Sequence, residues 1–131
     1  MQANPVPSVF IVDDDHEMAR AVKMLFRLLR FDGSVFHSAR ELASHMLAAP
    51  SLPDLLVVDM SMPEVNGMDV VKWIRSSKRF KNLPIIVLSA EIHPELVNDA
   101  IAAGANAYLF KPVLLEDLEA AVKRALGKTL H

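Results

Sequence analysis

Short apolar runs recur along the chain and alternate with longer segments in which apolar residues stand three or four positions apart. The runs are rich in Val, Ile, Leu and Phe, which is typical of strands covered on both faces. They are Val9–Val12, the weaker Ser34–Phe36, Leu55–Val58, Ile85–Leu88 and Ala107–Phe110. We therefore predict five mostly buried strands.

The segments between the runs have the spacing of one helical face. In the first, this spacing continues to Leu29, and we expect Gly33 to end the helix. A capping box at Ser38 to Glu41 opens the second helix, and Pro94 stands where a first-turn proline of the fourth is expected. Before the third helix, Asn66-Gly67 indicates a turn with positive φ, set by the glycine.

The regular alternation of strand and helix favours an α/β fold with a parallel sheet and helices on both of its faces, because each parallel pairing needs a right-handed crossover. A chain of 131 residues has room for one compact domain. The carboxyl ends of all the strands then lie at one edge of the sheet, where open parallel sheets bind ligands.

Composition excludes several classes of function. A net charge of -2 gives no broad reason to bind DNA or RNA directly, and the absence of cysteine excludes disulfides and thiolate metal sites. The apolar stretches are too short to cross a bilayer, and the first residues lack the pattern of a signal peptide, so we expect a cytoplasmic protein with no membrane partner.

Four of the runs stop at residues suited to phosphoryl chemistry. These residues are Asp13-Asp14, Asp59, Ser89 and Lys111. Crowded carboxylates are unfavourable unless a cation offsets them, and an all-oxygen donor set favours Mg²⁺ or Mn²⁺. An aspartate can attack phosphorus, while a metal, a lysine and a hydroxyl group neutralise and position the phosphoryl oxygens. We therefore predict a metal and phosphoryl site at this edge.

The motifs that carry these residues resemble the receiver domains of two-component response regulators, and the resemblance covers nearly the whole chain, from about Val9 to about Leu126. Together, and in this order, they are highly specific. They are Val12-Asp13-Asp14, Val58-Asp59-Met60-Ser61-Met62-Pro63 with Gly67, Leu88-Ser89-Ala90, and Tyr108-Leu109-Phe110-Lys111-Pro112.

The resemblance implies a role for each matching residue. Asp59 is expected to be the phosphoacceptor, and Lys111 to contact the phosphoryl group. Asp14, Asp59 and the backbone carbonyl of Ser61 are expected to bind Mg²⁺ directly, with Asp13 acting through a metal-bound water.

The resemblance also implies a conformational switch. Ser89 and Tyr108 are expected to form the switch pair, and the bond between Lys111 and Pro112 to be cis. Ser61 and Glu91 stand at positions that influence dephosphorylation in this family. The surface of the fourth helix, fifth strand and fifth helix would then transmit the signal.

The fold implied is flavodoxin-like, with strand order 2-1-3-4-5 and five helices in a single domain. We expect the receiver domain at residues 9–126, between an N-terminal extension at 1–8 and a C-terminal tail at 127–131. The expected partners are a sensor histidine kinase or histidine phosphotransfer protein and a downstream effector, and a phosphorylation-dependent dimer is compatible with the resemblance. Such a chain is a signalling switch with no enzymatic activity beyond its own phosphorylation and dephosphorylation.

Plainer interpretations compete for single residues. A lone aspartate after a strand is more often a helix cap than a nucleophile, and by position Asp15 is expected to cap the first helix. Ser89 could serve a turn, and Tyr108 could be an ordinary half-buried aromatic. The five histidines show no ligand spacing, so surface or packing roles are expected for them.

Other functions share this architecture. An adaptor that docks on proteins with little dependence on phosphorylation is one alternative. A metal-dependent aspartyl phosphohydrolase is disfavoured by the short connections, which leave no substrate-enclosing cap. A flavin or nucleotide domain is disfavoured because Asp13 to His16 stand where a Gly-rich phosphate loop belongs. The sequence is compatible both with a stand-alone receiver and with part of a longer regulator.

Overall fold

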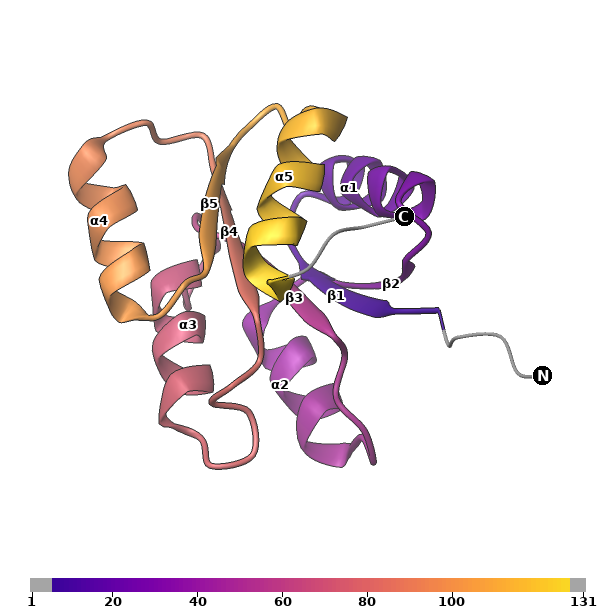
Figure 1. The fold of residues 1–131 in the computed structure, drawn as a ribbon. Coiled ribbons are helices and arrows are strands. Elements are labelled where there is room, and N and C mark those ends of the chain that lie inside the picture. Colours follow the sequence, from indigo (N-terminus) through magenta and orange to yellow (C-terminus); the bar gives the residue numbers. More distant parts are fainter. Residues whose placement is uncertain (1–5, 128–131) are drawn as a thin grey trace.

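Five strands and five helices alternate along the chain, as the computed structural model shows for residues 6–127. Figure 1 traces them in order. They are β1 (Ser8–Val12), α1 (His16–Leu28), β2 (Asp32–Phe36), α2 (Ala39–Ala48), β3 (Leu55–Asp59), α3 (Gly67–Ser76), β4 (Ile85–Ser89), α4 (Pro94–Ala103), β5 (Ala107–Phe110) and α5 (Leu115–Leu126).

The strands form one parallel sheet in the order β2-β1-β3-β4-β5, which confirms the predicted fold. Within the described residues, no helix is long and apolar enough to cross a membrane. Residues 128–131 of the predicted tail, including His131, and residues 1–5 of the predicted N-terminal extension lie outside the described residues.

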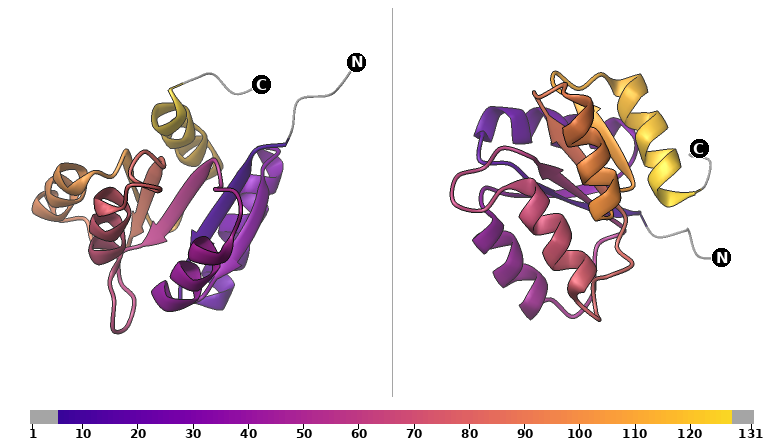
Figure 2. Two further views of the ribbon diagram at one scale, coloured as in Figure 1. Left: turned by 90° about the horizontal axis from the view of Figure 1, so that it is seen from below. Right: turned by 90° about the vertical axis from the view of Figure 1, so that its left-hand side faces the viewer.

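Helices lie on both faces of the sheet, as the views in Figure 2 show, and an apolar layer packs between the helices and each face. Side chains alternate along each strand: in β1, Val9 and Ile11 pack in the layer that includes α1 and α5, whereas Phe10 and Val12 pack in the layer that includes α2, α3 and α4. Because both faces are covered, the central strands are apolar at nearly every position, and β3 and β4 are buried throughout.

Most of the predicted helix signals are confirmed. The Ser38 hydroxyl accepts the backbone N–H of Glu41 at 3.0 Å, while the Glu41 carboxylate reaches back to the N–H of His37 at 3.2 Å. Pro94 occupies the first turn of α4, and Gly104, with φ of 121°, ends it.

The prediction that Gly33 ends the first helix is wrong. Helix α1 ends at Leu28, and Arg30 takes the positive φ of 68° that reverses the chain. Strand β2 therefore begins at Asp32, and Gly33 lies inside it, paired with Val9. A non-glycine residue in the left-handed region took the place that the pattern assigned to glycine.

Candidate functional site

The carboxyl edge of the sheet gathers the residues that the sequence singled out. Asp13 follows β1, Asp59 ends β3, Ser89 ends β4 and Lys111 follows β5. In the register, Asp59 pairs with Leu88, and Ser89 pairs with Phe110 of β5. The order β1-β3-β4-β5 places these strand ends side by side, as the topology rule predicted.

Lys111 forms an ion pair with two buried carboxylates. Its Nζ lies 2.8 Å from Asp59 Oδ1 and 3.3 Å from Asp13 Oδ2. Asp59 is 3% exposed and Asp13 is 1% exposed. One ammonium thus faces two carboxylates, which leaves this buried site with a surplus of negative charge when all three groups are ionised.

Burial and the neighbouring charges together shift the pKa values of Asp59 and Lys111. Burial raises the pKa of Asp59 to about 6; Asp13 adds to the rise, while hydrogen bonds from Lys111 and from the Ser61 backbone limit it. Burial opposes the charge of Lys111, but its hydrogen bond to Asp59 and the charges of Asp59 and Asp13 outweigh burial and raise its pKa. Asp59 is therefore ionised, and able to act as a nucleophile or ligand, above about pH 6.

The acidic cluster fits a hard divalent cation. One oxygen from each of Asp13, Asp14 and Asp59 lies within 4.8 Å of the other two. Asp14 is exposed, so the cluster opens to solvent on that side. Carboxylate oxygens without imidazole or thiolate favour Mg²⁺ or Mn²⁺, which keep several waters, and the surplus charge supplies the attraction.

Asp59 does not serve as a helix cap. The cap of α3 is Asn66, whose side chain accepts the N–H of Asp69 at 2.9 Å, so the capping interpretation of Asp59 is wrong. By contrast, Asp15 caps α1 as predicted, accepting the N–H groups of Glu17 and Met18.

The predicted role of Gly67 is also corrected. The positive φ in this loop belongs to Glu64, at 67°, and not to Asn66 or Gly67. A Cβ on Gly67 would stand 2.6 Å from the carbonyl oxygen of Asp59 and 2.8 Å from the Cα of Met60. The glycine is needed because the start of α3 packs directly against the end of β3.

Ser89 and Tyr108 are linked through the backbone of one residue. The Ser89 hydroxyl accepts the N–H of Glu91 at 2.9 Å, and the Tyr108 hydroxyl donates to the carbonyl oxygen of Glu91 at 3.2 Å. Ser89 is fully buried and Tyr108 is half-buried. The turn role of Ser89 is therefore real, and it ties the serine and the tyrosine to the same peptide segment.

An open groove of about 730 Å³ runs between the β3–α3 connection and α4. Ser61 and Glu91, which the family resemblance connects with dephosphorylation, are in its lining. The complete lining is Met60, Ser61, Met62, Asn66, Met68, Glu91, Leu96 and Asp99.

The bond between Lys111 and Pro112 is cis, as expected.

Sequence reasoning missed the contact between two histidines at this edge. The rings of His16 and His37 stack with centroids 3.7 Å apart and planes 3° apart, and His37 Nδ1 lies 3.1 Å from the carbonyl oxygen of Asp13. Ligand spacing along the chain could not reveal the pair. The available signal was topological, because His37 follows β2 and His16 begins the helix after β1.

Comparison with known proteins agrees with this geometry. Residues 9–123 match the response regulator receiver domain family. The chain is 34% identical over 123 residues to the chemotaxis protein CheY of Pseudomonas aeruginosa, covering 91% of this chain and 98% of that one. It is also 34% identical over 119 residues to CheY1 of Helicobacter pylori, covering 91% and 96%.

Solved structures give the same answer. A putative response regulator from Chloroflexus aurantiacus superposes with a TM-score of 0.87 at 29% identity, covering 95% of this chain and all of that one. The chemotaxis response regulator CheY4 of Vibrio cholerae superposes with a TM-score of 0.83 at 27% identity, covering 93% and 100%. The chain therefore belongs to the response regulator receiver domains, signalling switches of two-component systems that bind Mg²⁺ through an acidic cluster and interact with histidine kinases and downstream effectors.

Proposed function

We propose that Asp59 accepts a phosphoryl group from a phosphohistidine on a sensor histidine kinase or a histidine phosphotransfer protein. The observation that carries the proposal is the placement of Asp59 against Lys111 Nζ, at 2.8 Å, inside the only cluster of carboxylates among residues 6–127 that could hold a metal. In the transfer, a carboxylate oxygen of Asp59 forms a bond to phosphorus, the P–N bond breaks, and its electron pair leaves with the donor imidazole.

The surrounding residues supply charge and position. Lys111 would hold a phosphoryl oxygen, since its ammonium already lies between two carboxylates at the strand ends. Asp14, Asp59 and the Ser61 carbonyl would bind the metal, and Asp13 would act through a bound water. The metal, when bound, neutralises negative charge on the phosphoryl oxygens. The raised pKa of Asp59, about 6, leaves it ionised at neutral pH.

The switch would begin at Ser89. Its hydroxyl oxygen accepts the Glu91 N–H, and movement toward a phosphoryl oxygen on Asp59 would break that bond. Because Tyr108 donates to the carbonyl of the same residue, the loss would loosen the tyrosine from its half-buried position. Ser89→Ala should therefore permit phosphorylation while weakening its effect on Tyr108.

The signal would leave through the surface of α4, β5 and α5. Large apolar side chains are already exposed there: one each on α4, β5 and α5, and one at the residue before α5. They are Ile101, Phe110, Leu114 and Leu115, exposed by 46, 46, 53 and 39%. A downstream effector, or a second phosphorylated copy, would bury this surface.

The direct test is phosphorylation by acetyl phosphate and Mg²⁺, followed by intact-protein mass spectrometry. Wild type should gain the mass of one phosphoryl group, Asp59→Asn should gain none, and Asp32→Asn, which changes an exposed aspartate at the start of β2, should behave like wild type. Labelling that persists in Asp59→Asn would overturn the assignment. Labelling without any change at Tyr108 would favour the adaptor alternative.

A further inference from the structure

The loop that carries Asp13 and Asp14 is held from outside by the junction between β2 and α2. The first link is backbone pairing, since the Asp13 N–H donates to the carbonyl oxygen of Phe36 at 2.9 Å. The second uses the His37 ring, whose Nδ1 lies 3.1 Å from the carbonyl oxygen of Asp13. A carbonyl oxygen only accepts hydrogen bonds, so the ring hydrogen stands on Nδ1.

The third link is the stack between His37 and His16. The rings are parallel within 3° at a centroid distance of 3.7 Å, and His16 is the first residue of α1. Segment 13–16, which comprises the β1–α1 loop and the first residue of α1, is thus bound to His37 at both of its ends, by a hydrogen bond at Asp13 and by ring contact at His16.

His37 is itself fixed by the start of α2. Its backbone N–H donates to the Glu41 carboxylate at 3.2 Å, and the Glu41 N–H donates to the Ser38 hydroxyl at 3.0 Å. The capping box therefore does more than begin a helix, because it also places the imidazole that reaches Asp13. These bonds hold the backbone of His37, so the imidazole reaches Asp13 from a fixed point of the chain.

The pair is not a metal site of its own. The nitrogen lone pairs of an imidazole lie in the plane of its ring, and two parallel planes 3.7 Å apart cannot direct them at one ion. No group of three or more ligand residues that could hold a metal includes either histidine among residues 6–127.

We propose that His37 and His16 are positioning residues for the divalent cation, fixing segment 13–16 so that the carboxylates of Asp13 and Asp14 face Asp59 before the cation arrives. The inference rests on the proposed metal site. A loop that must be ordered on binding reduces the affinity for the cation, so residues that hold the ligands in place beforehand raise this affinity. Loss of one such residue typically lowers metal affinity by about 10-fold or more.

The test is titration of the full chain with Mn²⁺ at pH 7.5, with free Mn²⁺ measured by electron paramagnetic resonance. His37→Ala should raise the Mn²⁺ dissociation constant by about 10-fold. His37→Asn, which retains an N–H donor near the Nδ1 position, should recover most of the affinity. His16→Ala should raise the constant by about 3-fold through loss of the stack, and His16→Phe should restore it.

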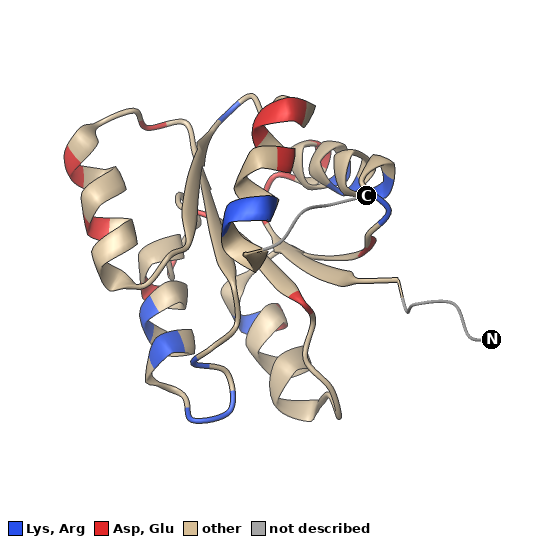
Figure 3. Cartoon of the chain, in the orientation of Figure 1, with Lys and Arg blue, Asp and Glu red and all other residues tan. Residues whose placement is uncertain are grey.

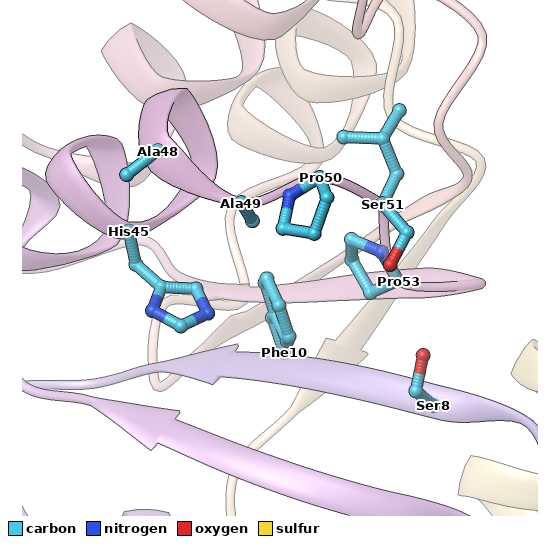
Figure 4. A pocket seen from close by; sticks show the side chains of 9 residues that line it. Ser8, Phe10, His45, Ala48, Ala49, Pro50, Ser51 and Pro53 are labelled. Carbon is cyan, nitrogen blue, oxygen red and sulfur yellow. The ribbon is translucent and has the colours of Figure 1, made fainter.

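His45 offers a matched control. Its ring packs on Phe10 and Phe36, with centroids 5.3 and 5.0 Å away, and lines a cavity of about 350 Å³ with Ser8, the first residue of β1, and Pro53 (Figure 4). His45→Ala should lower thermal stability and leave the Mn²⁺ constant unchanged.

The outcomes separate the two proposals. Wild type that fails to bind Mn²⁺ would sink the metal site and the positioning role together. Wild type that binds, with the constant unchanged in His37→Ala, would overturn the positioning role alone. An equal loss of affinity in His45→Ala would also overturn it, because the effect would then be one of general stability.

Discussion

The two edges of the sheet each bury part of a cation, and they surround it differently. At the carboxyl edge, Lys111 faces the charged groups Asp13 and Asp59. Near the amino edge, Arg75 of α3 donates only to neutral oxygens: the carbonyls of Gly104, Lys81 and Leu83 at 2.9, 3.0 and 2.6 Å, and Asn106 Oδ1 at 3.0 Å.

The difference separates a site that can react from one that only holds the fold. Arg75 ties α3 to the connection before β4 and to the end of α4, and burial lowers its pKa. Its guanidinium already donates four hydrogen bonds to neutral oxygens of the protein, so little of its hydrogen-bonding capacity is left for a ligand to satisfy. Lys111 leaves one carboxylate in excess, and that excess attracts a cation or a proton.

The surface charges follow the same division. Residues 72–81 contain Lys72, Arg75, Lys78, Arg79 and Lys81 and no acid. Figure 3 shows blue segments over α3 and the connection after it, whereas red segments gather at the start of α4 and of α5. The net charge of -2 is therefore unevenly distributed: the amino edge of the sheet is basic, whereas the carboxyl edge, which contains Asp59, is acidic.

The largest effect is expected at the amino edge. Arg75→Met removes four hydrogen bonds and leaves their acceptors partly unsatisfied, which should lower the free energy of unfolding by about 3 kcal/mol, independently of Mg²⁺. Urea unfolding measures it. Lys72→Met, at an exposed position of the same helix, should change stability by less than about 0.5 kcal/mol. A loss that Mg²⁺ repairs would contradict the division between the edges.

A smaller loss is expected from Gly67→Ala. The added methyl meets backbone atoms of Asp59 and Met60, which cannot move aside as a side chain can, so we expect a loss of about 2 kcal/mol together with weaker Mn²⁺ binding. Gly33→Ala is the control, because its methyl would meet side-chain atoms and no backbone, the nearest being Lys23 Cγ at 3.3 Å. Equal losses in both variants would show that crowding at the end of β3 is unimportant.

Asp59→Asn should stabilise the protein at neutral pH. With a folded-state pKa of about 6 and an ordinary value of 3.8, the unfolded chain releases its proton first, so this group lowers stability as the pH rises from about 4 to 6 and by a constant amount above. The difference between the two pKa values corresponds to about 3 kcal/mol at pH 7.5. Because the amide of asparagine replaces the hydrogen bond of the carboxylate to Lys111 only in part, we expect a gain of roughly 2 kcal/mol without Mg²⁺, and none below pH 4. Urea unfolding of wild type and Asp59→Asn across this pH range measures the difference in stability. A difference that does not change with pH would show that the charge of Asp59 does not destabilise the folded protein.

The smallest effect is expected from Lys111→Met. The two buried carboxylates lose their cation, but Asp59 can take up a proton, so the loss at pH 7.5 should be about 1 kcal/mol. Millimolar Mg²⁺ should restore most of it, unlike the loss in Arg75→Met. Thermal unfolding with and without Mg²⁺ makes the comparison, and a loss that Mg²⁺ leaves untouched would place Lys111 with Arg75 as a structural cation.

Sequence patterns fared differently at different elements. The continuous apolar runs at β3 and β4 identified strands that are buried throughout, because such runs have few other stable placements. Single turn residues were less reliable: Arg30 reversed the chain before Gly33, and Glu64 took the positive φ expected near Asn66. Local preferences at such positions are worth about 1 kcal/mol, and packing of the flanking elements exceeds that.

By itself, the sequence determined the order of the elements, the parallel sheet and the edge at which Asp13, Asp59, Ser89 and Lys111 gather, because periodicity reports which side of each segment is buried and topology places the strand ends. Only the tertiary structure decided which side chains touch. Lys111 meets Asp13 across 98 positions of chain, and His37 reaches back to the loop at His16. Such pairings depend on how distant segments pack within a few ångströms, which no local pattern of residues records.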